Sequence, residues 1–176
     1  MPKTTIWLSP LNEKRLLSTN RKIMSSDQTF ANKLRVRVCG LLIQNDEILL
    51  AQIHSPITEK LVWMPPGGGL TLGESMKDCL KREFKEETNL SVEVHKLVHM
   101  NELLRKSYHA VECFFEVKKR GGTEKLGKDP ELSWDRQLLH NLQWISVDEL
   151  SELDFAPSSL VEKIQNWDQR FNYPVF

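Results

Sequence analysis

Residues 68–90 of this 176-residue chain have the sequence GGLTLGESMKDCLKREFKEETNL. The second part of the stretch predicts a helix over 75–88. Met76, Leu80 and Phe84 recur at intervals of four residues, which places apolar side chains on one helical face.

A glycine-rich segment leads into this expected helix. Residues 65–69 are PPGGG, and half of the chain's 8 glycines lie within residues 67–73. Clustered glycines let the backbone take positive φ angles and approach a ligand closely. The segment is therefore a candidate ligand-binding loop.

Three carboxylates gather on one face of the expected helix. Glu83, Glu86 and Glu87 are spaced i, i+3 and i+4, and such positions are neighbours on a helix surface. Two unit charges about 4 Å apart repel by roughly 4 kcal/mol at an effective dielectric near 20. Arg82 can pair with Glu86, but it neutralises one charge only. A bound divalent cation would relieve the repulsion, and the alternative is an acidic helix face exposed to water.

The glycine-rich loop favours the first interpretation. A Gly-rich turn that leads into a helix offers backbone N–H groups and the positive helix end to an anion. Its exposed carbonyl groups are also potential metal ligands. Loop and carboxylates together predict a site where a metal ion assists chemistry on a phosphate group.

These residues resemble the Nudix box, whose pattern is G-x5-E-x7-R-E-U-x-E-E-x-G-U, where U is a bulky apolar residue. The matching positions are Gly68, Glu74, Arg82, Glu83, Phe84, Glu86, Glu87 and Leu90. Asn89 stands where the family usually has glycine. Asparagine tolerates the left-handed conformation that ends a helix, so we interpret this departure as conservative. The lead-in WMPPGGG at residues 63–69 is also similar to that of Nudix enzymes, and the resemblance covers roughly residues 34–165.

The resemblance implies a hydrolase of phosphoric anhydride bonds that cleaves a nucleoside diphosphate linked to another group, X. The ligands that it implies for Mg²⁺ or Mn²⁺ are Glu83, Glu86, Glu87 and, as an extra ligand, the Gly67 carbonyl. Arg82 would orient a metal-binding glutamate through a salt bridge. Glu74 would hydrogen-bond to the loop or support a metal-bound water.

The general base implied by the resemblance is either a box glutamate or an acidic residue from a later loop. Our loop candidates are Glu131 and Asp129, with Glu124 third, and the alternative for all three is an ordinary solvated charge. We hypothesise that Glu131 helps to bind the metal or activates water.

Four residues are candidate substrate contacts. Gly68 and Gly69 belong to the glycine-rich loop. Arg37, like Arg35, alternates with core residues on the first strand. It is a candidate contact for phosphate or for a partner subunit, with a solvated strand face as the alternative. Tyr108 lies near a position where some dinucleoside-polyphosphate-cleaving Nudix proteins have a tyrosine, and sheet packing is its alternative.

The remaining pattern predicts one α/β domain. Residues 34–43, a turn at Asn45-Asp46 and residues 48–51 predict a β-hairpin. Further strands are expected at 92–99, 109–117 and around 142–146. Strands and helices are mixed without repeats, and the resemblance makes this a Nudix-type α/β/α sandwich with a mixed β-sheet.

The domain boundaries follow from where this pattern begins. Residues 1–33 are weakly patterned and are predicted to form a flexible N-terminal arm, or leader residues upstream of a start near Met24. Residues 34–176 are expected to form the Nudix hydrolase domain. Residues 118–136 are expected to form a long polar loop of the kind that is functional or disordered.

Composition excludes several classes of protein. Apolar residues make up 40% of the chain, and 24 basic side chains balance 24 acidic ones, which excludes collagen-like and wholly disordered chains. The zero net charge gives no general attraction to nucleic acid, and no nucleic-acid partner is expected. No run approaches the length of a membrane span. Cys39, Cys79 and Cys113 lie among apolar neighbours, so we expect buried free thiols and a cytoplasmic location.

Other functions on the same fold remain open at this stage. A nucleotide-sugar-sensing module without catalytic activity is the first alternative, although every box carboxylate is present. A dinucleoside polyphosphate hydrolase and an isoprenoid diphosphate isomerase are further alternatives, and the isomerase would use a cysteine such as Cys39 or Cys113 together with a glutamate. We prefer a nucleotide sugar such as ADP-ribose, or a nucleoside triphosphate, as the substrate. The resemblance is also compatible with a homodimer.

Overall fold

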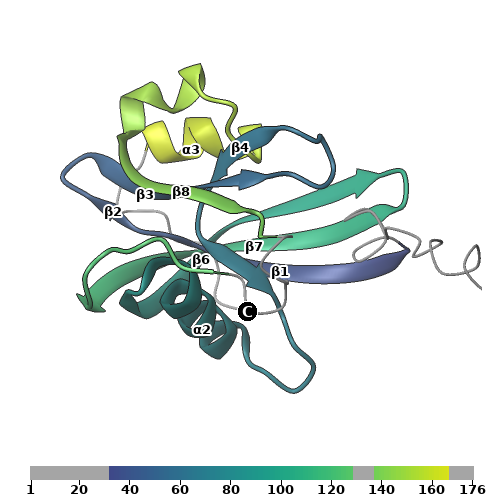
Figure 1. Ribbon diagram of the computed structural model, residues 1–176, viewed down its shortest axis with the longest axis horizontal. Coiled ribbons are helices and arrows are strands. Elements are labelled where there is room, and N and C mark those ends of the chain that lie inside the picture. The colour runs from purple at the N-terminus through teal and green to yellow at the C-terminus, as the bar shows by residue number, and fades with distance from the viewer. Residues whose placement is uncertain (1–31, 129–136, 167–176) are drawn as a thin grey trace, which may run out of the picture.

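Two β-sheets form the centre of the fold in the computed structural model, which describes residues 32–128 and 137–166 (Figure 1). In the first sheet, β1 runs parallel to β7, whereas the β1–β5 and β6–β7 pairs are antiparallel. The strand order is β5 (Gly67–Gly69), β1 (Lys33–Leu41), β7 (Tyr108–Gly121) and β6 (Ser91–Arg105). The predicted mixed sheet is therefore confirmed.

The second sheet is antiparallel and is organised around one strand. Its members are β2 (Ile43–Gln44), β3 (Glu47–His54), β4 (Leu61–Met64) and β8 (Leu139–Ser146). The central strand β3 pairs with each of the other three.

Helices cover the two sides of this β structure. The helix α2 (Met76–Thr88) packs on one side, and the short helices η3 (Val147–Glu152), η4 (Ser158–Leu160) and α3 (Val161–Gln165) pack on the other (Figure 1). One apolar cluster contains buried residues of α2 and the first sheet, and a second contains residues of both sheets and the short helices. This arrangement confirms the expected α/β/α sandwich.

The predicted box helix is present, and its ends are defined by the residues that flank it. The hydroxyl of Ser75 accepts a hydrogen bond from the Asp78 N–H at the N-terminus. Asn89 ends the helix with φ 59° and ψ 11°, in the left-handed region. Its side chain also donates to the Thr123 carbonyl at 3.0 Å and accepts from Lys85 Nζ at 2.9 Å. Asparagine thus supplies the conformation expected of glycine and adds two hydrogen bonds.

Close packing joins this helix to the first sheet. Leu80 and Phe84 are completely buried, and a Cβ atom on Gly40 of β1 would overlap the Phe84 ring. The absence of a side chain at Gly40 therefore lets the ring lie directly on the strand. This contact fixes the distance between the carboxylate-bearing helix and the central sheet.

The predicted hairpin is present in shortened form. Asn45 and Asp46 form its turn with φ angles of 53° and 61°, and they connect β2 to β3. The first strand, β1, does not pair with β3, and instead pairs with β7 and β5. The prediction was wrong on this point because alternation shows which residues share a face but not which distant strand lies alongside.

The predicted long loop starts later than expected. β7 continues to Gly121, so residues 118–121 are paired with β6. Residues 129–136, which contain the candidates Asp129 and Glu131, lie outside the described residues. All three cysteines are free and buried, as predicted.

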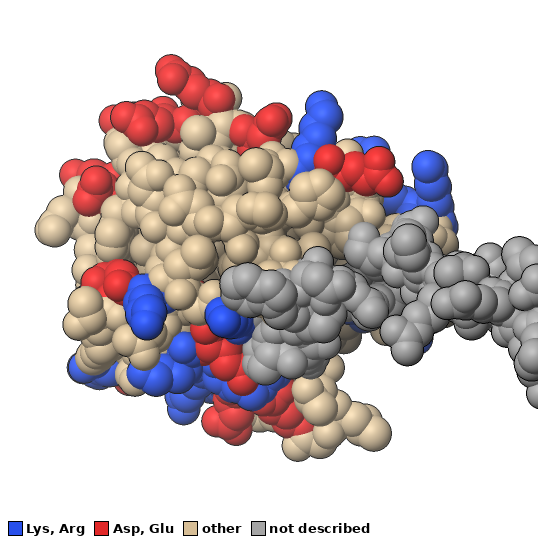
Figure 2. Space-filling model, viewed as in Figure 1, with Lys and Arg blue, Asp and Glu red and all other residues tan. Residues whose placement is uncertain are grey.

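The distribution of charge over the surface and the character of the helices complete the description. Acidic and basic side chains are interspersed over the lower part of the molecule near α2, whereas the upper edge near η3 is mainly acidic (Figure 2). None of the helices in the described part of the chain is long and apolar enough to cross a membrane.

Candidate active site

Arg82 lies at the centre of a carboxylate cluster on α2. Its Nε and Nη2 donate to the two carboxylate oxygens of Glu74, at 2.9 and 3.0 Å. Its Nη1 lies 2.9 Å from Glu83 Oε1 and 3.1 Å from Glu86 Oε2. One guanidinium therefore holds three carboxylates in fixed positions, and sequence spacing had predicted only its pairing with Glu86.

The strand β5 lies against these carboxylates because its glycines have no side chains. A Cβ atom on Gly68 would overlap the Glu83 carboxyl group, so glycine makes room for that group. The N–H of Gly67 donates to Glu87 Oε2 at 2.9 Å. Gly67 itself has φ 147°, and a Cβ atom there would overlap the backbone of β1. The loop and the helix are thus joined through backbone and carboxylate.

Arg37 approaches the same loop from β1. Its Nη2 lies 3.3 Å from the Gly67 carbonyl oxygen and 3.9 Å from the Met64 sulfur. Arg37 is half-buried, so the solvated-face interpretation was wrong. That interpretation failed because strand alternation cannot show that the second sheet covers this face.

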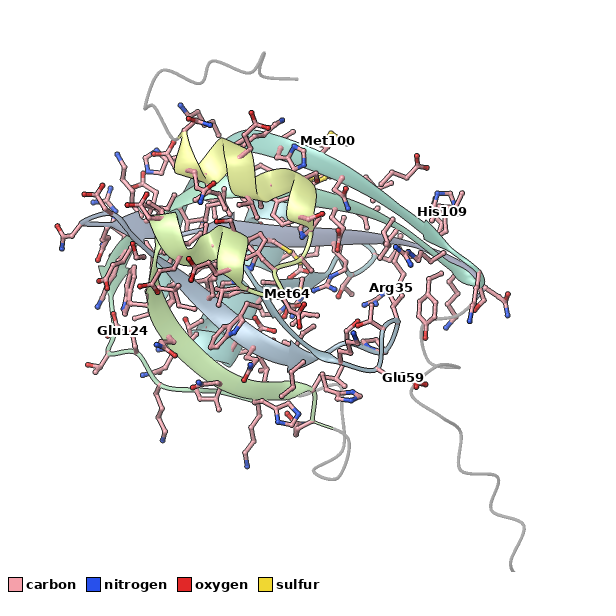
Figure 3. The ribbon with its side chains drawn as sticks, turned by 90° about the horizontal axis from the view of Figure 1, so that it is seen from above. Arg35, Glu59, Met64, Met100, His109 and Glu124 are labelled. Atoms are coloured by element: carbon pink, nitrogen blue, oxygen red, sulfur yellow. The ribbon has the colours of Figure 1, made fainter. Side chains whose placement is uncertain are left out.

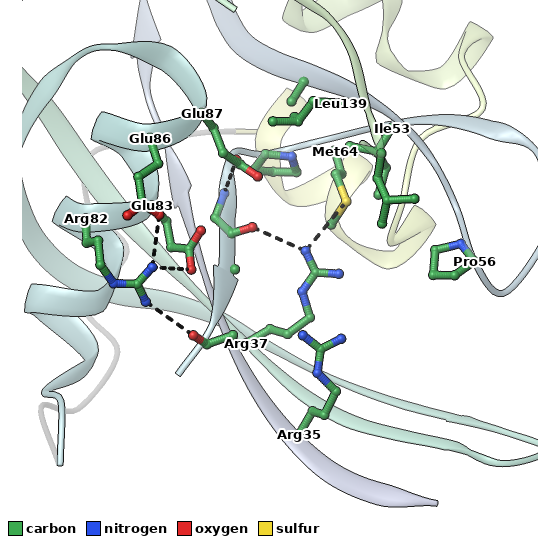
Figure 4. Close-up of a pocket in the computed structure, with 16 residues that line it drawn as sticks. Arg35, Arg37, Ile53, Pro56, Met64, Arg82, Glu83, Glu86, Glu87 and Leu139 are labelled. Carbon is green, nitrogen blue, oxygen red and sulfur yellow. Dashed lines mark hydrogen bonds and ion pairs between the residues drawn. The ribbon is translucent and has the colours of Figure 1, made fainter. Parts of the chain in front are cut away.

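These groups form the walls of one cavity of about 80 Å³ (Figure 4). Glu83, Glu86 and Glu87 line it from α2, and Arg35 and Arg37 line it from β1. Glycines of β5 lie between the two walls, and Met64, Ile53 and Leu139 add an apolar part. The cavity therefore presents carboxylates, with Arg82 among them, on one side and the guanidiniums of Arg35 and Arg37 on the other.

The ion pairs shift the protonation equilibria of their members. The hydrogen bond between Arg82 and Glu74 is the main cause that raises the pKa of Arg82 and lowers the pKa of Glu74 from their ordinary values. Burial opposes the charge of Arg37, but Cys39 and the nearby carboxylates, led by Glu112, raise the pKa of Arg37 overall. Both arginines are therefore charged at neutral pH.

Comparison with known proteins agrees with this geometry. A model of the NUDIX domain matches residues 33–165 of the chain. The protein belongs to the NUDIX family. The predicted Nudix hydrolase, an enzyme that acts on phosphoric anhydride bonds, is confirmed at the level of this family.

Individual Nudix relatives are similar over much of their length. A MutT-like protein of Streptomyces ambofaciens is 29% identical over 117 residues, or 66% of this chain and 67% of that protein. A solved NUDIX hydrolase from Nitrosomonas europaea has a TM-score of 0.62 at 21% identity, over 76% of this chain and 87% of its own. An ADP-ribose pyrophosphatase from Streptococcus suis has a TM-score of 0.55 at 21% identity, over 74% of this chain and 87% of its own. The two structural likenesses show a shared fold.

The Nudix-box donors suit a hard divalent cation. Within residues 32–128 and 137–166, no three His, Cys, Asp or Glu side chains converge as a finished metal centre does. Glu83 and Glu86 are instead held by Arg82, and Glu87 by the Gly67 N–H. Mg²⁺ typically takes one or two carboxylates and completes its shell with water and substrate phosphate oxygens. An open row of carboxylates fits that requirement without a closed cage.

Two other candidates lie away from the box cavity. Tyr108 is buried, and its hydroxyl donates to the Pro56 carbonyl at 3.3 Å, so it lines a neighbouring cavity instead. Glu124 pairs with Lys119 at 2.7 Å and lies well away from Arg35 (Figure 3). The hydrogen bond from Lys119 is the main cause that lowers the pKa of Glu124. Glu124 therefore remains an ionised surface group outside this cavity.

The segment after β7 returns to the Nudix-box helix. The N–H of Lys125 donates to the Thr88 carbonyl at 3.0 Å, and that of Gly127 donates to the Glu87 carbonyl at 2.8 Å. These bonds satisfy carbonyl groups at the helix end that have no partner within the helix. A Cβ atom on Gly127 would overlap the Glu86 backbone. An isolated glycine in a polar segment is the one sign of this contact in the sequence.

Proposed function

We propose that the protein is a Mg²⁺- or Mn²⁺-dependent pyrophosphohydrolase that cleaves a nucleoside diphosphate linked to a group X. The observation that carries this proposal is the opposition of two charged walls in one cavity, with three carboxylates facing two guanidiniums. A metal-bound diphosphate needs both, because carboxylates hold the cation and arginines hold the phosphate oxygens.

In this proposal each wall has a separate role. Glu83, Glu86 and Glu87 hold the cation, and the Gly67 carbonyl is an extra ligand. A bound cation would neutralise the diphosphate and acidify a water molecule. Arg82 fixes the carboxylates through its three ion pairs. It is a positioning residue, because it acts through the groups that touch the cation.

The second wall binds substrate. Arg37 and its neighbour Arg35 bind phosphate oxygens, and the backbone of Gly68 and Gly69 follows the diphosphate. Tyr108 contacts the nucleoside from the neighbouring cavity. Support for this division comes from the positions of Arg35 and Arg37, which line both cavities.

Glu131 is our candidate for the general base or a further metal ligand. We expect Glu131→Gln to lower kcat at least tenfold, in line with the contribution of a general base, about 10²–10⁴-fold. The variant should keep the circular-dichroism spectrum and melting temperature of the wild type. An unchanged kcat in a folded variant would contradict this role.

One experiment tests the proposed activity. Product release is measured from nucleotide sugars, nucleoside triphosphates and dinucleoside polyphosphates, with Mg²⁺ and with chelator. We expect metal-dependent cleavage of a nucleotide sugar such as ADP-ribose or of a triphosphate, and its loss in Glu86→Gln. Glu93→Gln is the control, because Glu93 of β6 pairs with Arg120 of β7 and does not line the cavity. Nucleotide binding without turnover would contradict the enzyme and favour the sensing module.

We also propose a cytoplasmic homodimer. The three free buried cysteines support a reducing compartment. Leu34 and Leu104 are 66% and 67% exposed, and they flank His109 in the strands on either side of it. They form an exposed apolar surface that a second copy of the chain could cover. Sedimentation of the intact chain and of a deletion lacking residues 1–23 tests the assembly and the contribution of the N-terminal arm. A monomeric intact chain would contradict the dimer.

A further inference from the structure

A second cavity of about 180 Å³ adjoins the box cavity. The two share a wall formed by Arg35, Arg37, Ile53, Pro56 and Met64. The second cavity is mainly apolar, with Val62, Leu103, Ala110 and Pro157 among its lining residues. Small-molecule sites typically combine an apolar lining with a few placed polar groups. The polar groups of this cavity therefore decide what it can bind.

The most unusual of these groups is Glu112. It is 5% exposed, although it lies in β7 among apolar neighbours. Its Oε2 accepts a hydrogen bond from Asn101 Nδ2 at 2.9 Å, across the β6–β7 pair. A buried carboxylate normally has charged or several hydrogen-bonding partners. The charged neighbour of Glu112 is Arg37, its register partner in β1. The one side-chain hydrogen bond of Glu112 among the described residues is the bond from Asn101, which leaves acceptor capacity for a ligand.

Asn101 adds a second acceptor beside this carboxylate. Its amide nitrogen, Nδ2, donates to Glu112. The amide oxygen, Oδ1, takes no part in that bond and remains an acceptor. Both residues line the second cavity. The pair therefore supplies two kinds of acceptor, a carboxylate and an amide oxygen, from two residues that line the cavity.

Arg37 supplies donors on the shared wall. Its Nη2 is bonded to Gly67 and Met64, whereas its buried Nε has no hydrogen-bond partner among the described residues. A guanidinium has five N–H donors, and those of Arg37 are only partly used. Arg37 and Glu112 are register partners in β1 and β7, so the polar pattern on this side of the cavity is two acceptors and one donor group. The other polar lining residues are Arg35, Ser55, Thr58, Arg105, Tyr108 and His109.

This pattern matches one nucleobase edge best. Guanine carries two adjacent donors, N1–H and the 2-amino group, beside the O6 acceptor. Adenine and cytosine have a single amino donor next to a ring acceptor, and uracil has one N–H between two acceptors. A ligand other than guanine would leave one acceptor of Glu112 or Asn101 facing an acceptor of the base.

We propose that Glu112 and Asn101 make the enzyme selective for guanine nucleotides, with the base in the second cavity and the diphosphate in the first. The inference rests on the proposed function for the position of the diphosphate. Glu112 and Asn101 together accept hydrogen bonds from the N1–H and the 2-amino group of guanine. Arg37 donates a hydrogen bond to the guanine O6.

The test measures binding of GMP, IMP and AMP by calorimetry in the presence of chelator. These monophosphates contain no pyrophosphate bond, so the readout does not depend on catalysis. We expect GMP to bind at least tenfold more tightly than AMP, and IMP, which lacks the 2-amino group, to lie between them. In Glu112→Gln the preference for GMP over AMP should fall below twofold.

Two further variants keep this test interpretable. Glu116→Gln is the matched control, because Glu116 lies on the same strand, pairs with Lys96 and does not line the cavity. Asn101→Ala is the second variant if Glu112→Gln does not fold, and it should also reduce the preference at least fivefold. Equal binding of GMP and AMP by the wild type, no measurable GMP binding, or a preference that survives both substitutions would overturn the inference.

The same measurements separate this inference from the proposed function. GMP selectivity without metal-dependent hydrolysis of any substrate would overturn the hydrolase and leave the guanine site intact. Hydrolysis at equal rates for all bases would overturn the guanine site and leave the hydrolase intact.

Discussion

Glu74, just before the Nudix-box helix, forms a two-point ion pair with Arg82 in the middle of that helix, with N–O distances of 2.9 and 3.0 Å. The two oxygens of the carboxylate face two nitrogens of the guanidinium, which leaves Nη1 directed toward Glu83 and Glu86. Glu74 therefore determines the rotation of the guanidinium plane. The orientation of that plane in turn determines where the carboxylates of Glu83 and Glu86 lie.

Arg82→Lys should impair the site without removing its charge. Lysine has one ammonium group and cannot bond Glu74 at two points while contacting two other carboxylates. Loss of a group that orients metal ligands typically costs about 10–100-fold in metal affinity or activity. Titration with Mn²⁺ followed by electron paramagnetic resonance measures the affinity. Lys81→Gln is the control on the same helix, and wild-type affinity in Arg82→Lys would contradict the role.

The Glu74–Arg82 pair should also make stability depend on pH. The hydrogen bond from Arg82 lowers the pKa of Glu74 from 4.5, so the ionised form is favoured in the folded protein. Its stabilising contribution is present above the unfolded pKa and is lost as the pH falls through the folded pKa. Urea unfolding of the wild type and of Glu74→Gln, from about pH 7 to about pH 3, measures the contribution of the pair to the free energy of unfolding at each pH. The difference in unfolding free energy should shrink below pH 4.5, and a difference independent of pH would contradict the prediction.

Gly68→Ala should damage the site more than the fold. The new methyl group would overlap the Glu83 carboxyl group, which is the end of a flexible side chain and can move away. We expect metal affinity to fall about 10–100-fold, with melting close to that of the wild type. The double variant with Glu83→Gln should lose little more than either single variant, because both changes act on one carboxylate. Additive losses would show that the methyl group acts elsewhere.

Gly127→Ala should have the opposite effect and destabilise the fold. The methyl group would overlap the backbone of Glu86, which cannot move without disturbing the helix. Overpacking of this kind costs about 1–3 kcal/mol of unfolding free energy. Gly121→Ala is the control, because its methyl group would meet nothing within 4 Å. Equal urea midpoints for the two variants would contradict the contact.

The cysteines should resist alkylation in the folded protein. All three are buried, and burial raises the pKa of Cys39 and of Cys79 to about 12. Burial also raises the pKa of Cys113. The reactive thiolate form is therefore scarce. Mass spectrometry after iodoacetamide treatment should show unmodified native protein and three modifications after denaturation. Rapid modification of a cysteine in the native protein would contradict this prediction and favour the isomerase alternative, which needs a reactive cysteine.

The local features of the fold could be predicted because they depend on neighbouring residues. Ser75 and Asn89 flank the box helix as their capping preferences indicate, and the Asn45-Asp46 turn follows from the tolerance of both residues for positive φ. The carboxylate row of the box follows from helical periodicity alone. These predictions need no information about which distant segments meet.

The second cavity could not be predicted because distant segments form it. Asn101 and Glu112 come from the antiparallel strands β6 and β7, and Arg37 comes from β1, which pairs with β7 in parallel. A glutamate in the apolar stretch around residues 108–117 is visible in the sequence. Its burial depends on the second sheet, whose position relative to the first is set by packing and not by local pattern.

The backbone of Gly67 connects the two cavities. Its N–H bonds to Glu87, and its carbonyl oxygen accepts from Arg37, which lines both cavities. Occupancy of either cavity therefore acts on a backbone group of the same residue. Thermodynamic reciprocity then requires that the factor by which Mg²⁺ changes the affinity for GMP equals the factor by which GMP changes the affinity for Mg²⁺. Any coupling between the base and the cation would thus have the same size in both directions.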